Sequence, residues 1–142
     1  QKPTRDALDR SVKALTALAD GNAGSPVRLV TENWFDLLAE PAHVHYLLDR
    51  LDGRVGLLGD FGNWGGDNKY SDLKSIFGRA ELCHAKASFA GGELDEADYG
   101  ACVTLAEQAG YKGPYTLIFD NEIPGEWHGL ATERDFITSR DV

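Results

Sequence analysis

The sequence has few basic residues, only two cysteines and no long apolar run. Its 14 lysines and arginines stand against 23 aspartates and glutamates, which gives a formal charge of −9. Because proteins bind nucleic acids largely through basic side chains that neutralise the phosphates, this negative net charge argues against a nucleic-acid partner. No apolar stretch approaches the roughly 18 residues that a membrane-spanning helix needs, so we expect no membrane partner. Cys83 and Cys102 lie inside apolar segments without the spacing of a metal knuckle, which predicts two reduced, buried thiols in a cytoplasmic protein.

The chain alternates regularly between helical and strand-like patterns. Apolar residues at helical spacing predict five helices. Four begin at or just after Thr4, Pro41, Ser71 and Asp95, and the fifth spans Leu130 to Ile137. Short apolar runs predict four strands between them, at 27–32, 55–60, 81–86 and 115–119. Continuously apolar strands joined by helices are typical of a parallel sheet that is buried on both faces. With 42% apolar residues, the sequence predicts one α/β domain over residues 1–142.

Four parallel strands make an awkward complete domain, but they equal half of an eight-stranded α/β barrel. The predicted order also begins with a helix rather than a strand. We therefore predict half of a (β/α)8 TIM barrel, with a small open α/β sheet of the flavodoxin kind as the alternative. A half-barrel leaves two sheet edges and one apolar face unpaired. The sequence thus predicts a partner, either the missing amino-terminal half-barrel or a second copy of the chain.

Residues that could bind a metal follow the predicted strands at the ends where barrel chemistry gathers. Glu32 ends the first strand, Asp60 ends the second, and His84 lies near the end of the third. Each of these alone is more typical of a helix cap, a solvated carboxylate or a half-buried histidine. Together, at corresponding positions of successive units, they favour a site for Mn²⁺, Mg²⁺, Co²⁺ or Zn²⁺ with positions open for substrate oxygens.

At these positions the sequence resembles the sugar phosphate isomerase/epimerase family, the xylose-isomerase-like TIM barrels. The matching pieces are Glu32-Asn33, Asp60-x-Gly62-Asn63, His84-x-Lys86 and the stretch 110–114. They cover essentially the whole chain and correspond to the carboxyl-terminal half of a family barrel.

The resemblance implies that Glu32, Asp60 and His84 bind a divalent metal. The family's fourth ligand, a glutamate, falls at Ile118, and Asp120, two residues further and on the same side of the strand, is the expected substitute.

The resemblance also implies a function, which is the metal-dependent isomerisation or epimerisation of a sugar or sugar phosphate. The expected chemistry is proton transfer through an enediolate, with Glu32 as the base and Lys86 binding an oxyanion. The substrate contacts expected beside them are Asn33, Trp34, Asn63 and Trp64.

Two other functions compete with this interpretation. A non-catalytic half-barrel or pseudoenzyme fragment is favoured by Ile118 at the usual glutamate position. An apurinic endonuclease-like hydrolase shares the barrel and part of the ligand set. It needs a histidine-rich cluster of metals and a basic DNA-binding face, which four histidines and a charge of −9 fit poorly.

Overall fold

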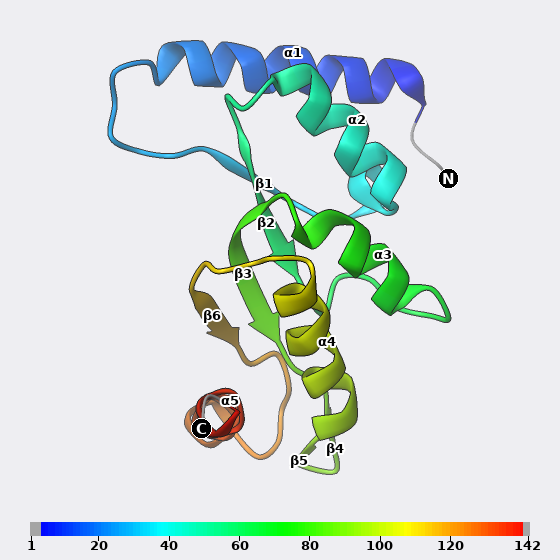
Figure 1. The fold of residues 1–142 in the computed structure, drawn as a ribbon, viewed down its shortest axis with the longest axis vertical. Helices are drawn as coiled ribbons and strands as arrows, with labels where there is room; N and C mark the ends of the chain where they lie inside the picture. The colour runs from blue at the N-terminus through cyan, green and yellow to red at the C-terminus, as the bar shows by residue number, and fades with distance from the viewer. Residues whose placement is uncertain (1–3, 141–142) are drawn as a thin grey trace.

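The fold is built on a four-stranded sheet in which every strand runs parallel to its neighbours, as the computed structural model of residues 4–140 shows (Figure 1). The strands follow the order β1 (Val30–Glu32), β2 (Gly56–Asp60), β3 (Ala80–Lys86) and β6 (Tyr115–Ile118). The predicted α/β fold with four parallel strands that alternate with helices is confirmed. Residues 1–3 and 141–142 of the predicted domain lie outside the described residues.

Five helices connect and flank the strands. They are α1 (Arg5–Gly21), α2 (Pro41–Leu51), α3 (Lys69–Phe77), α4 (Glu96–Gln108) and α5 (Glu126–Ser139). Helices α1 and α4 begin after Thr4 and Asp95 as predicted, and the side chains of these two residues cap them by accepting hydrogen bonds from the amides of Ala7 and Asp98. A short 3-10 helix, η1 (Asp36–Leu38), follows β1. No helix within residues 4–140 is both long and apolar enough to cross a membrane.

Several element boundaries differ from the prediction for local reasons. The first strand begins at Val30 instead of residue 27, because the Asn22 and Ser25 side chains bond the carbonyl and the amide of Val27 and so remove it from the ladder. Helix α3 begins before Ser71, whose hydroxyl bonds the Asn68 carbonyl inside the first turn and does not cap the helix.

The last helix and the segment around Gly91 and Gly92 also depart from the sequence-based expectation. The last helix begins at Glu126, four residues earlier than expected. The two glycines have positive φ, as a tight turn requires, and they join a small antiparallel hairpin of β4 (Phe89–Ala90) and β5 (Glu93–Leu94) that the sequence did not predict.

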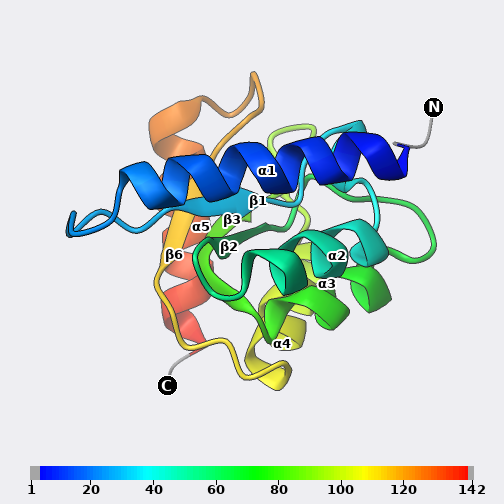
Figure 2. The same cartoon turned by 90° about the horizontal axis from the view of Figure 1, so that it is seen from above.

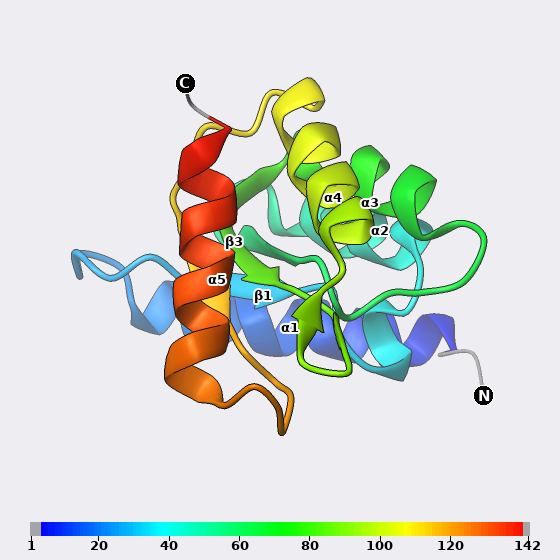
Figure 3. The ribbon, with the colours of Figure 1, turned by 90° about the horizontal axis from the view of Figure 1, so that it is seen from below.

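The sheet is covered fully on one face only. Helices α2, α3 and α4 lie side by side along that face (Figure 2), where Leu57, Cys83 and Ala85 are completely buried. Helix α5 lies next to β6 (Figure 3), and α1 packs against α2. On the opposite face, Leu58 is only partly buried and Leu82 is 37% exposed. Within residues 4–140 the helices thus cover one face, and the other face is not buried as it would be in a complete domain, which is consistent with the predicted half-barrel.

Close packing under the sheet fixes the position of the end of β2. Gly59 faces α3, and a β-carbon added there would lie 2.6 Å from Cζ of the buried Phe77 ring. The helix can approach the strand this closely only because residue 59 has no side chain.

We therefore expect Gly59→Ala to lower the free energy of unfolding by about 1–3 kcal/mol, because the added methyl group overpacks the core. Urea denaturation measures the change. Gly65→Ala is the matched control, since a β-carbon there meets nothing within 4 Å. Equal stability of the two variants would show that the contact between β2 and α3 is loose.

Candidate metal centre

Three potential metal ligands meet at the carboxyl ends of β1, β2 and β3. Glu32 is the last residue of β1, and the ladder places Asp60, the last residue of β2, opposite His84 of β3. His84 Nδ1 lies 3.7 Å from Glu32 Oε1 and 3.6 Å from Asp60 Oδ2. One ligand atom from each residue lies within 4.8 Å of the other two, and no other such group of three occurs in residues 4–140. The structure thus brings the expected ligands together.

These separations suit a bound cation. Ligand atoms about 2.1 Å from a metal lie roughly 3.0–3.4 Å from each other in tetrahedral or octahedral geometry. The two separations from His84, 3.6 and 3.7 Å, need to close by only a few tenths of an ångström, and all three ligand atoms lie within 4.8 Å of one another. Two carboxylates and one imidazole are also a donor set that divalent transition metals accept. The residues present therefore fit a divalent ion.

Asp60 is the most firmly held of the three. Its carboxylate accepts a hydrogen bond of 2.6 Å from the Gly62 amide, so the chain turns back directly after β2. The Asn33 side chain bonds both backbone groups of Asp60, accepting from its amide at 2.7 Å and donating to its carbonyl at 3.1 Å. Asn33 is completely buried, so the structure places this expected substrate contact in a supporting position. It ties the end of β1 to the end of β2.

Burial raises the pKa of Asp60 above its ordinary value, and the nearby charge of Glu32 raises it further. The hydrogen bond from Gly62 and the positive charges of Lys86 and His84 act in the opposite direction. The direction of the shift means that the buried carboxylate lacks full compensation for its negative charge. A divalent cation between Glu32 and Asp60 would supply that compensation.

Glu32 is positioned by Asn63, whose amide nitrogen donates a 2.6 Å hydrogen bond to Glu32 Oε1. Both side chains are partly buried at the edge of the sheet. Asn63 is thus beside the centre, as expected of a substrate contact, and it also fixes one carboxylate oxygen of Glu32. The other oxygen is not held by this bond.

Lys86 and Asp120 form an ion pair beside the three ligands. The Lys86 ammonium lies 3.0 Å from Asp120 Oδ2. The Asp120 side chain is 72% exposed and lies just after the end of β6, outside the group that Glu32, Asp60 and His84 form within the described residues. The structure therefore does not bring the expected fourth ligand to the centre. Its carboxylate contacts the lysine instead.

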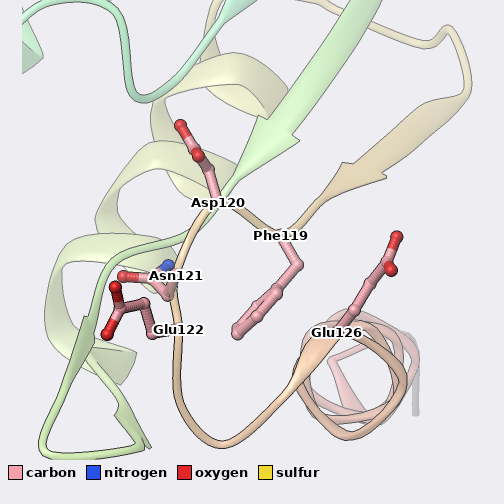
Figure 4. Close-up of a pocket in the computed structure, with 5 residues that line it drawn as sticks. All are labelled: Phe119, Asp120, Asn121, Glu122 and Glu126. Atoms are coloured by element: carbon pink, nitrogen blue, oxygen red, sulfur yellow. The ribbon is translucent and has the colours of Figure 1, made fainter.

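The loop that carries Asp120 lines a surface pocket with Phe119, Asn121, Glu122 and Glu126. Figure 4 shows that its three carboxylates point in different directions and do not converge on one point. The acidic lining therefore does not form a second metal centre.

The two tryptophans expected to contact a sugar lie in different environments. Trp34 is 52% exposed and stacks on Phe35, with ring centroids 4.2 Å apart. Trp64 is buried and donates a 3.0 Å hydrogen bond to the Leu38 carbonyl, yet it lines a surface pocket with Phe35 and Asn63. Phe35 was not predicted. It adopts a φ of 51°, which is uncommon for a bulky residue, and nothing in the sequence signals that conformation.

A second buried carboxylate, Glu133, lies on α5, away from Glu32, Asp60 and His84. It is completely buried, and among the described residues neither of its oxygens has a hydrogen-bond partner of normal geometry. Burial raises its pKa to about 7, although the Ile118 amide of β6 acts to lower it. Burial and then the charge of Glu133 raise the pKa of Tyr99 on α4, so α4 faces the same space. The helical spacing from Leu130 and Ile137 already puts Glu133 on the apolar face, which is the signal that could have identified it.

Comparison of the chain with known proteins neither supports nor contradicts the resemblance described above. Neither a family model, nor a curated protein, nor a solved structure matches this chain.

Glu133 makes stability depend on pH in a defined direction. Its pKa is about 7 in the folded chain and 4.5 ordinarily, so the folded state binds more protons between these values. The contribution of Glu133 is therefore fully present below pH 4.5 and is lost as pH rises through 7. We expect Glu133→Gln to be more stable than the parent chain at pH 8 by about 2–3 kcal/mol, and by much less at pH 4.5.

Urea denaturation at the two pH values measures the difference between the variant and the parent chain. Glu126→Gln, an exposed position on the same helix, should show no such pH-dependent difference. A Glu133→Gln difference that does not change with pH would mean that the buried carboxyl keeps its ordinary pKa.

Proposed function

We propose that this chain is the metal-binding half of a divalent-metal-dependent isomerase or epimerase that acts on a sugar or sugar phosphate. One observation carries the proposal, which is the convergence of Glu32, Asp60 and His84 at the carboxyl ends of three neighbouring parallel strands. In a (β/α)8 barrel, that end of the sheet is where catalytic groups gather. The resemblance to xylose-isomerase-like barrels supports the choice of substrate.

In this proposal, different side chains around the centre bind the metal, remove the proton and bind the oxyanion. A divalent ion held by Glu32, Asp60 and His84 would supply the positive charge that acidifies a C–H group next to a substrate carbonyl. Glu32 would remove the proton with the oxygen that Asn63 does not hold. Lys86, on the same strand face as His84, would bind the oxyanion of the developing enediolate. The Trp34–Phe35 pair offers an exposed apolar surface to the carbon face of a sugar.

The second part of the proposal is that the sheet is half of a TIM barrel, completed by another half-barrel. Two features support it. The partly exposed Leu58 and Leu82 lie on the same sheet face as Asp60 and His84, where a barrel would place its interior. The outer strands β1 and β6 each pair with only one neighbour in the described part of the chain, so their free edges carry backbone groups available for a further strand.

The completing unit is proposed to be the missing amino-terminal half-barrel. A second copy of this chain would bring another charge of −9 and another pair of carboxylates to the same barrel end. The buried, free thiols of Cys83 and Cys102 suit the cytoplasm, where we place the protein.

The site is tested by metal titration of the 142-residue chain. Isothermal titration calorimetry with Mn²⁺ should show near-stoichiometric binding, and Asp60→Ala should weaken it by at least about tenfold, because the variant loses one of three protein ligands. Asp67→Ala is the matched control, since Asp67 is exposed in the neighbouring loop and should leave affinity unchanged. Equal affinity in the parent chain and Asp60→Ala would refute the assignment.

Glu32→Gln separates metal binding from catalysis in the same experiment. It should retain measurable Mn²⁺ binding but abolish exchange of solvent deuterium into ketose substrates, which NMR follows directly. Metal binding by the parent chain without deuterium exchange, even with the completing half-barrel present, would favour the non-catalytic interpretation.

The assembly prediction follows from the uncovered face and edges. Because an apolar face and unpaired strand edges are costly in water, we expect the isolated chain to self-associate, or to bind a second half-barrel when one is supplied. Multi-angle light scattering and native mass spectrometry measure this. A strictly monomeric, fully folded chain at high concentration would contradict the half-barrel and favour the small open sheet.

A further inference from the structure

Asp120 contacts the Lys86 ammonium, a positively charged group of the protein beside the proposed metal site. The contact spans two elements, since Lys86 ends β3 and Asp120 follows β6. The separation of 3.0 Å is that of a charge-assisted hydrogen bond. Lys86 is only 24% exposed, whereas Asp120 is mostly in solvent. The ammonium thus points away from the sheet interior toward an exposed carboxylate.

The stem of Lys86 passes directly beside Asp60. A β-carbon added to Gly62 would lie 2.6 Å from Cδ and 3.0 Å from Cγ of Lys86, so the aliphatic chain lies against the Gly62 backbone. The amide of the same glycine donates to the Asp60 carboxylate. The Lys86 pKa is raised, first by the hydrogen bond to Asp120 and then by the charges of Asp60 and Glu32 among others. The ammonium is therefore within electrostatic reach of two metal ligands.

The placement of the Lys86 ammonium matters because of the charges on the neighbouring carboxylates. The two carboxylates, Glu32 and Asp60, would together match the charge of one divalent ion. A Lys86 ammonium that moved onto these carboxylates would cancel one of the two charges and occupy the space of the ion. Lysine has a flexible four-carbon stem, so the backbone alone does not prevent this movement.

We propose that Asp120 is a positioning residue that holds the Lys86 ammonium away from Glu32 and Asp60 and so keeps these carboxylates available to the metal. This inference rests on the proposed metal site and gives Asp120 a role other than that of a fourth ligand. Asp120 acts on the cation only through Lys86.

A double-mutant cycle distinguishes action through Lys86 from direct coordination. Mn²⁺ affinity is measured by calorimetry at low ionic strength for the parent chain, Asp120→Asn, Lys86→Met and the double variant. Asp120→Asn should lower affinity by about three- to tenfold, because Lys86 then competes with the ion. Lys86→Met should bind at least as tightly as the parent chain. In the Lys86→Met background, Asp120→Asn should change affinity by less than about twofold.

Two controls separate position from net charge. Glu122→Gln removes the same charge from an exposed site in the same loop, and should cost less than Asp120→Asn. Asp120→Glu keeps a carboxylate for Lys86 and should restore most of the affinity. An Asp120→Asn loss that persists undiminished in the Lys86→Met background would show that Asp120 acts on the ion itself. No loss in Asp120→Asn would show that it does not restrain the lysine. Either result overturns the proposal.

A metal-free measurement keeps this inference separate from the proposed function. In a crystal structure of Asp120→Asn without metal, Lys86 Nζ should lie within about 4 Å of an Asp60 or Glu32 oxygen. A Lys86 ammonium that still points toward residue 120 would overturn the proposal. If the parent chain binds no cation at all, the proposed function fails, and this structure still decides whether Asp120 positions Lys86.

Discussion

The parallel register between β2 and β3 is the constraint on which the rest of the site depends. It places Asp60 opposite His84, and the pairing of β1 with β2 brings Glu32 to the same end of the sheet. His84 thereby comes within a few ångströms of Glu32 and Asp60, which are 52 and 24 positions away in the chain. Because parallel strands share one direction, their last residues meet without any special loop. Loops refine this arrangement but do not create it.

The loop contacts that refine it hold Asp60 and Glu32 in place. Asn33 secures the backbone of Asp60, Gly62 donates to its carboxylate, and Asn63 donates to Glu32. These neutral donors orient the carboxylates but leave their charge largely uncompensated, which is why burial still raises the Asp60 pKa.

Much of this arrangement is readable from the sequence, because local chemistry and strand periodicity agree. The apolar runs identify the strands, and the residues that follow them identify Glu32, Asp60 and His84 as neighbours. The role of Asn33 could not be predicted in this way. It lies just after β1, where the strand pattern no longer says whether a side chain faces the substrate or, as here, bonds the backbone of Asp60.

Asp120 fails for a related reason. The two-residue period that puts it on the side of Ile118 holds only while the strand continues, and β6 ends at Ile118. Beyond that residue the backbone turns, and the carboxylate points to Lys86. The sequence therefore predicts well what regular ladders determine, and poorly what happens one or two residues after they end.

Gly62 joins two tasks in one residue. Its amide binds Asp60, and its missing side chain leaves the space along which Lys86 lies. Any larger residue there would displace the lysine stem, which lies beside the amide that binds the carboxylate. The effects of changes at positions 60, 62 and 86 are therefore expected to be epistatic. A change at one of these three positions is expected to alter the surroundings of the other two.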